Sequence, residues 1–372
     1  MSGGITQLVA TGVQDAYLSG NPEVSFFRSS YKRYTHFASN IERQLIQGTP
    51  TSGGTSLVRF EKKGDLLSHV YFVVNNMTIN LLNPTRDWST VIDKVELLIG
   101  GQIIDTQDYP WSSAIEPIVG ASTFSNREFT ENTSAGFYPL KFFFCKDWQS
   151  ALPLVALQYH DVELRITWSS NLNLSETESV VCWTRFIYLD KDEREFFAKK
   201  SHDILITQVN RSVISPVSSY EFALSQPVKY IAFESNNYTT VYTNPVGGVS
   251  NCAALQFKMQ INGNDIGESR SLFQWADVNQ YYLTPFGYKP FTGVTTTANV
   301  AIVPFCLDTS KLQPTGTLNF SRIDTFRLVA PSTSGFHLIA KAKGPASGRF
   351  FYAVNYNILR IQNGMAGILY AS

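Results

Sequence analysis

The segment Val95–Asp105, VELLIGGQIID, places two β-prone runs on either side of Gly100-Gly101. Two-residue hairpins favour Gly-Gly, because a type I′ turn requires positive φ at both central positions. A similar segment, Ile261-Asn262-Gly263-Asn264, follows in the second half of the chain, and Asn-Gly suits the same turn. The two segments therefore predict equivalent β-hairpins in the two halves of the chain.

Further matches extend this repeat along the chain. Phe144-Cys145-Lys146-Asp147 recurs as Phe305-Cys306-Leu307-Asp308. Phe72 and Phe233 are separated by the same interval as these two motifs, and the two hairpin turns are separated by an interval one position longer. A chain of 372 residues is long enough for two domains of ordinary size. We therefore interpret the chain as two tandem copies of one domain.

Short strands separated by turns account for most of the remaining pattern. The predicted strands, rich in β-branched and aromatic residues, are Ser56–Glu61, His69–Val74, Val95–Ile99, Gln102–Asp105, Val162–Trp168, Phe257–Ile261 and Phe351–Ile361. Polar loops interrupt them at Ala121–Ala135 and Asn244–Asn251, and helices are predicted only at Asp190–Lys200 and after Asn21-Pro22. This spacing predicts an all-β chain of sandwiches of the Greek-key or jelly-roll kind.

The composition favours a folded chain whose surface is partly covered by other chains. Hydrophobic residues make up 44% and charged residues 16%, against roughly 25% charged in an average soluble protein. A formal net charge of zero argues against nucleic acid or an anionic membrane as the main partner. No signal peptide or membrane-spanning run is recognised. We expect a reducing, cytoplasm-like compartment and buried reduced thiols at Cys145, Cys182, Cys252 and Cys306.

Patterns typical of catalysis or metal binding are absent from the sequence. There is no G-x-S-x-G, P-loop, G-x-G-x-x-G after a strand or H-E-x-x-H, and the histidines are too scattered to form a local metal site. His160-Asp161 lies among strand residues, where neighbouring side chains point to opposite faces. The charges from Asp190 to Arg194 are typical of the solvated face of a short helix. We therefore expect no enzyme activity and no cofactor.

Two further sets of residues are candidate surface sites. Phe26–Tyr34 mixes aromatic residues with Arg28, Lys32 and Arg33, a composition found in nucleic-acid binding and in structural arms with a basic side. We favour the arm, because no second cluster of this kind accompanies it. Sequons, weak candidates for glycosylation without a signal peptide, stand at Asn76, Asn132, Asn173, Asn210, Asn237 and Asn319.

Several longer segments resemble the major capsid proteins of nucleocytoplasmic large DNA viruses, nearest to the chlorovirus and related algal-virus branch. The resemblance lies in Gly3–Ala10, Gln14–Pro22, Tyr31–Phe37, Val95–Asp105, Leu152–Leu164 (LPLVALQYHDVEL), Tyr188–Phe197, Pro314–Asp324 (PTGTLNFSRID) and Tyr352–Tyr370. These segments span nearly the whole chain in the order of the family. A single one would be weak, but together they make the resemblance specific.

The resemblance implies a double jelly roll of two eight-stranded antiparallel sandwiches, with an N-terminal arm and short helices. We expect the arm at residues 1–25, the first jelly roll at 26–189, a linker at 190–203 and the second jelly roll at 204–372. It further implies a homotrimer of pseudo-hexagonal outline that contacts neighbouring capsomers in an icosahedral shell. The arm would lie on the inner side, near minor capsid proteins and an internal membrane, with no specific nucleic acid. Assembly would take place in the host cytoplasm.

Two alternatives to a major capsid protein remain open on the sequence. A carbohydrate-binding or attachment protein is one, since β-sandwiches host many lectins, although no loop carries several acidic residues together. A minor capsid-protein paralogue at special lattice positions is the other. The chain is also short for the family, so elaborate outer loops, and glycosylation that depends on them, are not expected.

Overall fold

The computed structural model describes residues 2–10, 12–75, 88–120, 137–174, 178–215, 217–235, 256–284, 299–330 and 349–370. Met1–His36 and Phe37–Ser372 are separate compact units. The first unit contains α1 (Ser2–Val9), η1 (Val13–Asp15) and α2 (Ala16–Ser19). The helix predicted after Asn21-Pro22 is wrong: α2 ends before it, and Asn21 has a φ of 52°, which breaks helical geometry. The loops predicted at Ala121–Ala135 and Asn244–Asn251 lie outside the described residues.

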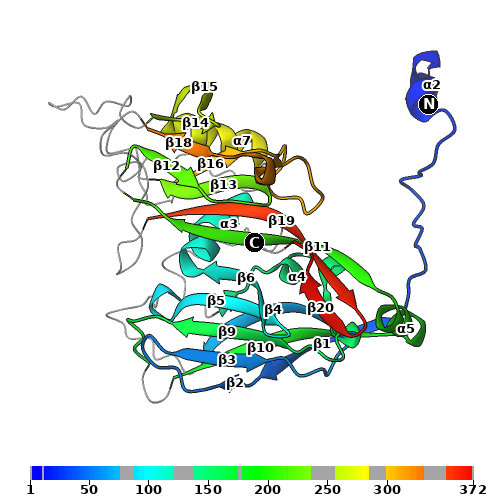
Figure 1. Cartoon of the computed structure of the whole chain (residues 1–372). Helices are drawn as coiled ribbons and strands as arrows, with labels where there is room; N and C mark the ends of the chain where they lie inside the picture. Colours follow the sequence, from blue (N-terminus) through cyan, green and yellow to red (C-terminus); the bar gives the residue numbers. More distant parts are fainter. Residues whose placement is uncertain are drawn as a thin grey trace, which may run out of the picture. The chain divides into compact units, whose positions relative to one another are not determined.

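The second unit begins with the described strands β1 to β10, which we call the first sandwich (Figure 1). They are β1 (Phe37–Gln44), β2 (Ile46–Gln47), β3 (Thr55–Arg59), β4 (Leu66–Asn75), β5 (Ile92–Ile99), β6 (Gln102–Asp108), β7 (Phe137–Pro139), β8 (Leu152–Pro153), β9 (Val162–Trp168) and β10 (Ser179–Leu189). They form two antiparallel sheets of order β1-β10-β4-β7 and β2-β3-β9-β5-β6, with β8 on β4. The predicted strands of this half are confirmed, and β9 has the predicted bounds.

The next ten strands form the second sandwich in the same order. They are β11 (His202–Val213), β12 (Ser219–Phe222), β13 (Pro227–Ser235), β14 (Gln256–Ile261), β15 (Asn264–Ser271), β16 (Asn299–Pro304), β17 (Leu318–Asn319), β18 (Phe326–Val329), β19 (Phe350–Gln362) and β20 (Met365–Ile368). The sheets run β11-β19-β13-β16 and β12-β18-β14-β15, with β17 on β13 and β20 on β19. Each half thus contains two antiparallel sheets, as the all-β prediction required, and the two halves share one order of four strands in each sheet, to which β2, β8, β17 and β20 are added.

The predicted hairpin turns are confirmed by their backbone angles. Gly100 and Gly101 have φ of 58° and 81° between β5 and β6, and Asn262 and Gly263 have φ of 48° and 80° between β14 and β15. A third such turn, Asn363-Gly364, joins β19 to β20 and was not predicted.

Helices occupy only short connections. They are η2 (Trp88–Thr90), η3 (Trp111–Ile115), α3 (Glu116–Val119), α4 (Phe143–Lys146), η4 (Trp148–Ser150), η5 (Leu154–Ala156), α5 (Lys191–Lys199), η7 (Gln274–Val278), α7 (Asn279–Leu283) and η8 (Phe320–Arg322). The predicted helix at Asp190–Lys200 is confirmed as α5, capped by the Asp190 carboxylate. The sequence did not predict the π-helices η3 and η7, which follow the second strand of each equivalent hairpin. No described helix is long and apolar enough to cross a membrane.

Each sandwich has an apolar core between its two sheets, and the first core also includes Ile206, Leu359, Ile361 and Ala366 of the second half. Residues alternate between core and outer face along the strands, as in β9, where every second side chain is buried. Phe72 of β4 and Phe233 of β13, which match in the sequence repeat, lie in the first and second core respectively. Trp275 of η7 stacks on Phe257 in the second core, with ring centroids 4.7 Å apart.

Candidate functional site: the seam between the two sandwiches

A third apolar cluster, which we call the seam, joins the first sandwich to the second. The helical segment η3–α3 follows β6 of the first sandwich and packs against the β11-β19-β13-β16 sheet of the second (Figure 1). Trp111 lies against Tyr352 of β19, with ring centroids 5.5 Å apart, and both side chains are buried. The remaining members are Ala114, Ile115, Ile118, Val119, Tyr230, Ala232, Val300, Ile302, Cys306 and Val354.

Asp108, the last residue of β6, is the main polar contact of the seam. Its Oδ2 accepts hydrogen bonds from the Tyr352 hydroxyl at 2.8 Å and from Arg211 Nη1 at 3.0 Å. Its Oδ1 accepts the backbone N–H of Trp111 at 3.0 Å, at the start of η3. Burial raises the pKa of Asp108, and its hydrogen bonds and Arg211 oppose that shift. One buried carboxylate therefore connects the helix start to two strands of the other sandwich.

Asp105, three residues earlier on β6, makes a second polar contact with the other sandwich. Its Oδ1 accepts the Val209 N–H of β11 at 2.9 Å, and its Oδ2 accepts Gln107 Nε2 at 2.9 Å. Gln208 Nε2 donates to the Ile104 carbonyl. Burial raises the pKa of Asp105 to about 6, although the hydrogen bonds that the carboxylate accepts lower it. The edge strand β6 is thus covered by β11, which prevents pairing with another strand there.

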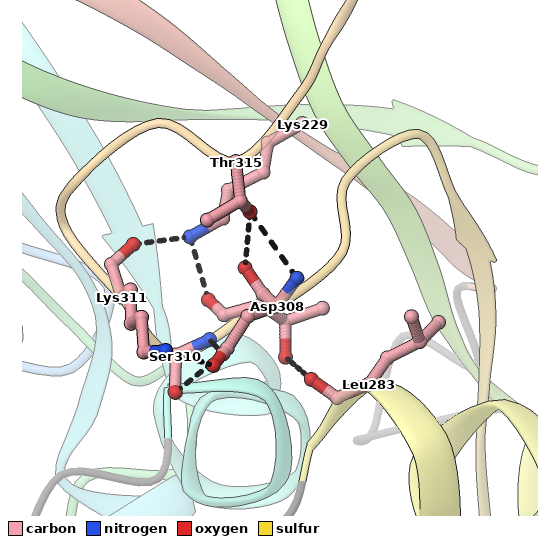
Figure 2. Close-up of polar contacts among 7 residues, drawn as sticks. Lys229, Leu283, Asp308, Ser310, Lys311 and Thr315 are labelled. Carbon is pink, nitrogen blue, oxygen red and sulfur yellow. Dashed lines mark hydrogen bonds and ion pairs between the residues drawn. The ribbon is translucent and has the colours of Figure 1, made fainter. Parts of the chain in front are cut away.

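A buried lysine organises the loop after β16 in the second sandwich. Lys229 of β13 is buried, and its Nζ donates to the Thr309 carbonyl at 2.7 Å and the Lys311 carbonyl at 2.8 Å (Figure 2). In the same loop, Ser310 donates its N–H and hydroxyl to Asp308 Oδ1. Burial lowers the pKa of Lys229 to about 8. The ammonium group of Lys229 therefore holds the loop to the sheet through two backbone carbonyl groups of the loop.

The equivalent loop of the first sandwich has no counterpart of Lys229 on the sheet, and its own Lys141 and Lys146 form ion pairs with Glu116 of α3. Ser68 of β4 takes the place of Lys229 in the sequence repeat, and its carbonyl accepts the Cys145 thiol at 3.9 Å. The next residue, His69, places Nδ1 3.1 Å from the Cys145 carbonyl. Burial lowers the pKa of His69, and it raises the pKa of the Cys145 thiol to about 12. Both loops carry the repeated Phe-Cys-x-Asp motif, but different residues hold the two loops to their sheets.

The cysteine prediction is confirmed where the structure describes it. Cys145, Cys182 and Cys306 are free and buried, whereas Cys252 lies outside the described residues. The pKa of the Cys182 thiol is also raised to about 12 by burial, so the thiol is protonated at neutral pH. These thiols fill the interior as small apolar groups.

None of the predicted surface residues is a member of the seam cluster. Arg28, Lys32 and Arg33 are exposed in the N-terminal unit. Among the sequons, Asn173 and Asn319 are exposed, while Asn76, Asn132 and Asn237 lie outside the described residues. Asn210 of β11 is half-buried and its amide donates to Asn355 Oδ1 at 2.8 Å, so a glycan there would displace this contact.

The structure gives His160 and Asp161 separate structural contacts. His160 Nδ1 accepts the backbone N–H of Ala366, and Asp161 forms ion pairs with Arg59 and Lys62. No group of three or more His, Cys, Asp or Glu residues suited to a metal ion occurs in the described part of the chain. The seam residues Asp105, Asp108 and Arg211 were not identified from the sequence. Their only signal was that two acidic residues, Asp105 and Asp108, end an otherwise β-prone segment.

Comparison with known proteins places these features in a family. A family model for the N-terminus of major capsid proteins matches residues 25–190, and a model for the large eukaryotic DNA virus major capsid protein matches residues 193–367. The major capsid protein of Paramecium bursaria Chlorella virus 1 is 30% identical over 447 aligned residues, and that of Pyramimonas orientalis virus is 29% identical over 419. Both alignments cover all of both chains.

Solved structures agree with the sequence matches. A quasi-atomic model of the PBCV-1 virus capsid superimposes with a TM-score of 0.71 at 26% identity, covering 94% of this chain and 100% of that chain. The Faustovirus major capsid protein has a TM-score of 0.58 at 10% identity, covering 95% of this chain and 94% of that chain, which shows the shared fold. The chain therefore belongs to the family of major capsid proteins of large eukaryotic DNA viruses, and it is a structural protein of the virion capsid.

Proposed function

We propose that the chain assembles as a homotrimer whose six sandwiches form a pseudo-hexagonal capsomer, and that such capsomers tile an icosahedral shell against their neighbours. The observation that carries the proposal is the repetition of one sandwich, with the same strand order, in each half of the chain. Two similar sandwiches allow a trimer to offer six similar lateral faces. The low charged fraction of 16% also suits a chain largely surrounded by other chains.

The finer parts of the proposal concern position in the particle. We place the N-terminal arm on the inner side of the shell, near minor capsid proteins and an internal membrane, with Arg28, Lys32 and Arg33 on its basic side. The proposed division is an arm at 1–25, jelly rolls at 26–189 and 204–372, and a linker at 190–203. The boundary between the two jelly rolls is supported by the described sheets, because none of these contains strands from both halves. Assembly would occur in the host cytoplasm, without a specific nucleic-acid contact.

We further propose that the chain has no enzymatic activity. The buried carboxylates Asp105 and Asp108 of the seam accept hydrogen bonds within the fold, and the three described thiols are buried, which raises their pKa. The curated relatives and the solved structures that match are capsid proteins. These observations support a role that is carried by surfaces of the protein.

Size-exclusion chromatography with multi-angle light scattering tests the proposed trimer. The purified full chain should elute with three times the mass of one chain, at concentrations from micromolar upward. Electron microscopy of the same fraction should show particles with a hexagonal outline. A mass equal to one chain across this concentration range would contradict the proposed trimer.

A further inference from the structure

The helical segments that follow the equivalent hairpins have different surroundings. Aligning the π-helices η3 and η7 pairs Trp111 with Gln274, Ile115 with Val278, Ile118 with Tyr281 and Val119 with Tyr282. The four residues of the first sandwich are buried in the seam. In the second sandwich Gln274 is exposed, and Val278, Tyr281 and Tyr282 are 36%, 60% and 73% exposed. We call these four residues of η7–α7 the helix face.

The sheets on which these segments would pack also differ in exposure: the sheet of the second sandwich is covered, and that of the first is exposed. In the second sandwich, the outer face of β11-β19-β13-β16 is covered by η3–α3. In the first sandwich, residues on the outer face of β1-β10-β4-β7 remain partly or largely exposed. We call Ile41, Tyr71, Phe137 and Trp183 of this face the sheet face.

Strand register shows that the sheet face is equivalent to the covered sheet. Trp183 of β10 pairs with Tyr71 of β4, as Tyr352 of β19 pairs with Ala232 of β13. The neighbours of Tyr71 and Trp183 along their strands, Phe72 and Cys182, point into the first core. Trp183 of the first sandwich is therefore equivalent to Tyr352 of the second sandwich, the residue that contacts Trp111.

Both faces have the composition of a protein interface. The helix face carries two tyrosines whose rings contact each other, with centroids 5.1 Å apart. On the sheet face, Ile41 and Phe137 are 48% and 44% exposed, and the Phe137 ring contacts Tyr71 at 6.1 Å. Tyrosine, tryptophan and phenylalanine are enriched in interfaces, and grouped exposed apolar side chains indicate a contact surface.

We infer that the helix face of one copy packs on the sheet face of a second copy and repeats, between chains, the contact that the seam makes within one chain. The inference rests on the proposed trimer and identifies the surfaces that would close it. Such a contact joins different patches on the two copies, so it is heterologous and generates a ring if the rotation closes. Three seams and three contacts of this kind would alternate around a ring of six sandwiches.

Paired charge substitutions on each face test the inference. The sheet face also carries the exposed Arg43 and Arg185, paired with Trp183 and Ile41, so the introduced charges are positive. The helix-face variant is Val278→Lys with Tyr282→Lys, and the sheet-face variant is Ile41→Lys with Phe137→Lys. Each should raise the dissociation constant of the trimer by more than about 100-fold, because unpaired charges would be buried in the contact. Tyr159→Lys, at an equally exposed tyrosine on neither face, should remain trimeric. Circular dichroism and thermal melting would show that each variant is folded.

Mixing the two variants tests the head-to-tail arrangement. In an equimolar mixture, the sheet-face variant keeps an intact helix face and the helix-face variant keeps an intact sheet face. These two faces allow one contact between two chains, so mass photometry should detect a dimer and no trimer. Recovery of the trimer on mixing would overturn the arrangement. If both variants remain trimeric like the wild type, the inferred surfaces are wrong while the proposed trimer stands. A monomeric wild type would instead contradict the proposed function itself.

A photo-crosslinking amino acid at Tyr282 of the wild-type trimer provides an independent readout. Crosslinks to peptides from β1, β4, β7 or β10 of another copy are expected. Crosslinks between the η7–α7 peptides of two copies would overturn the inference, because they require contact between identical patches.

Discussion

The seam helix η3–α3 and its counterpart η7–α7 occupy equivalent places in two similar sandwiches, and they differ in what covers them. The first is buried against the other half of the same chain, whereas the second has Tyr281 and Tyr282 largely exposed. The sequences differ accordingly, with Trp111 where the second segment has Gln274. Duplication therefore provided two similar binding elements, and one of them became an internal contact.

The largest expected difference between the two segments is at their first residues. Trp111→Ala should lower the free energy of unfolding by about 3–5 kcal/mol, because it leaves a cavity in the seam. Gln274→Ala should lower it by only about 1 kcal/mol, through loss of the capping bond that Gln274 Oε1 accepts from the Ser271 N–H. Urea unfolding at one fixed protein concentration measures both. Equal effects at the two positions would show that the segments are covered alike.

The two Phe-Cys-x-Asp loops should differ in their response to alkaline pH. Folding lowers the pKa of Lys229 from 10.5 to about 8, so the unfolded chain binds more protons between these values. The wild type should therefore gain stability as the pH rises from 8 to 10.5, by roughly 3 kcal/mol relative to Lys229→Met. Unfolding curves across this pH range measure the difference. Ser68→Ala, at the equivalent position, is the matched control and should track the wild type.

Asp108 provides a smaller test of the seam. Asp108→Asn should lower the free energy of unfolding by about 2 kcal/mol, since an amide cannot accept from both Tyr352 and Arg211 and from the Trp111 N–H. The control is Asp203→Asn, which removes an exposed ion pair with Arg360 and should have little effect. Thermal unfolding monitored by circular dichroism compares the two. Similar losses would mean that the seam carboxylate contributes no more than a surface ion pair.

Exchanging turn residues between the hairpins tests their turn chemistry, and Asn262→Gly has the smallest expected effect of these substitutions. Gly100→Asn should cost about 1–3 kcal/mol, because a Cβ at Gly100 overlaps the His160 ring. Asn262→Gly should cost about 1 kcal/mol, through loss of the Oδ1 contacts to the Asp324 and Thr325 N–H groups. Differential scanning calorimetry measures both. Two neutral exchanges would indicate that the turns are interchangeable despite their different neighbours.

Features that depend on neighbouring residues were predicted well from sequence. The two hairpins, strand β9 and helix α5 follow from turn chemistry, alternation and capping, all of which act over a few residues. The π-helices were missed although both runs carry a capping signal: the Asp108 carboxylate accepts the Trp111 N–H, and Gln274 Oε1 accepts the Ser271 N–H within Ser271-Leu272-Phe273-Gln274. Lys229 was missed as well, since the sequence of a strand does not show that a loop far along the chain will bury its amine.

The sequence by itself determined two tandem all-β domains, with equivalent hairpins at Gly100-Gly101 and Asn262-Gly263, because backbone angles and strand alternation are local properties. Only the tertiary structure decided which copy of the helical segment is covered. Trp111 meets Tyr352 from the other half of the chain, and such a contact depends on how two folded sandwiches pack. In the trimer that we infer, burial of the equivalent face at Tyr282 would depend on a second chain, which no local pattern specifies.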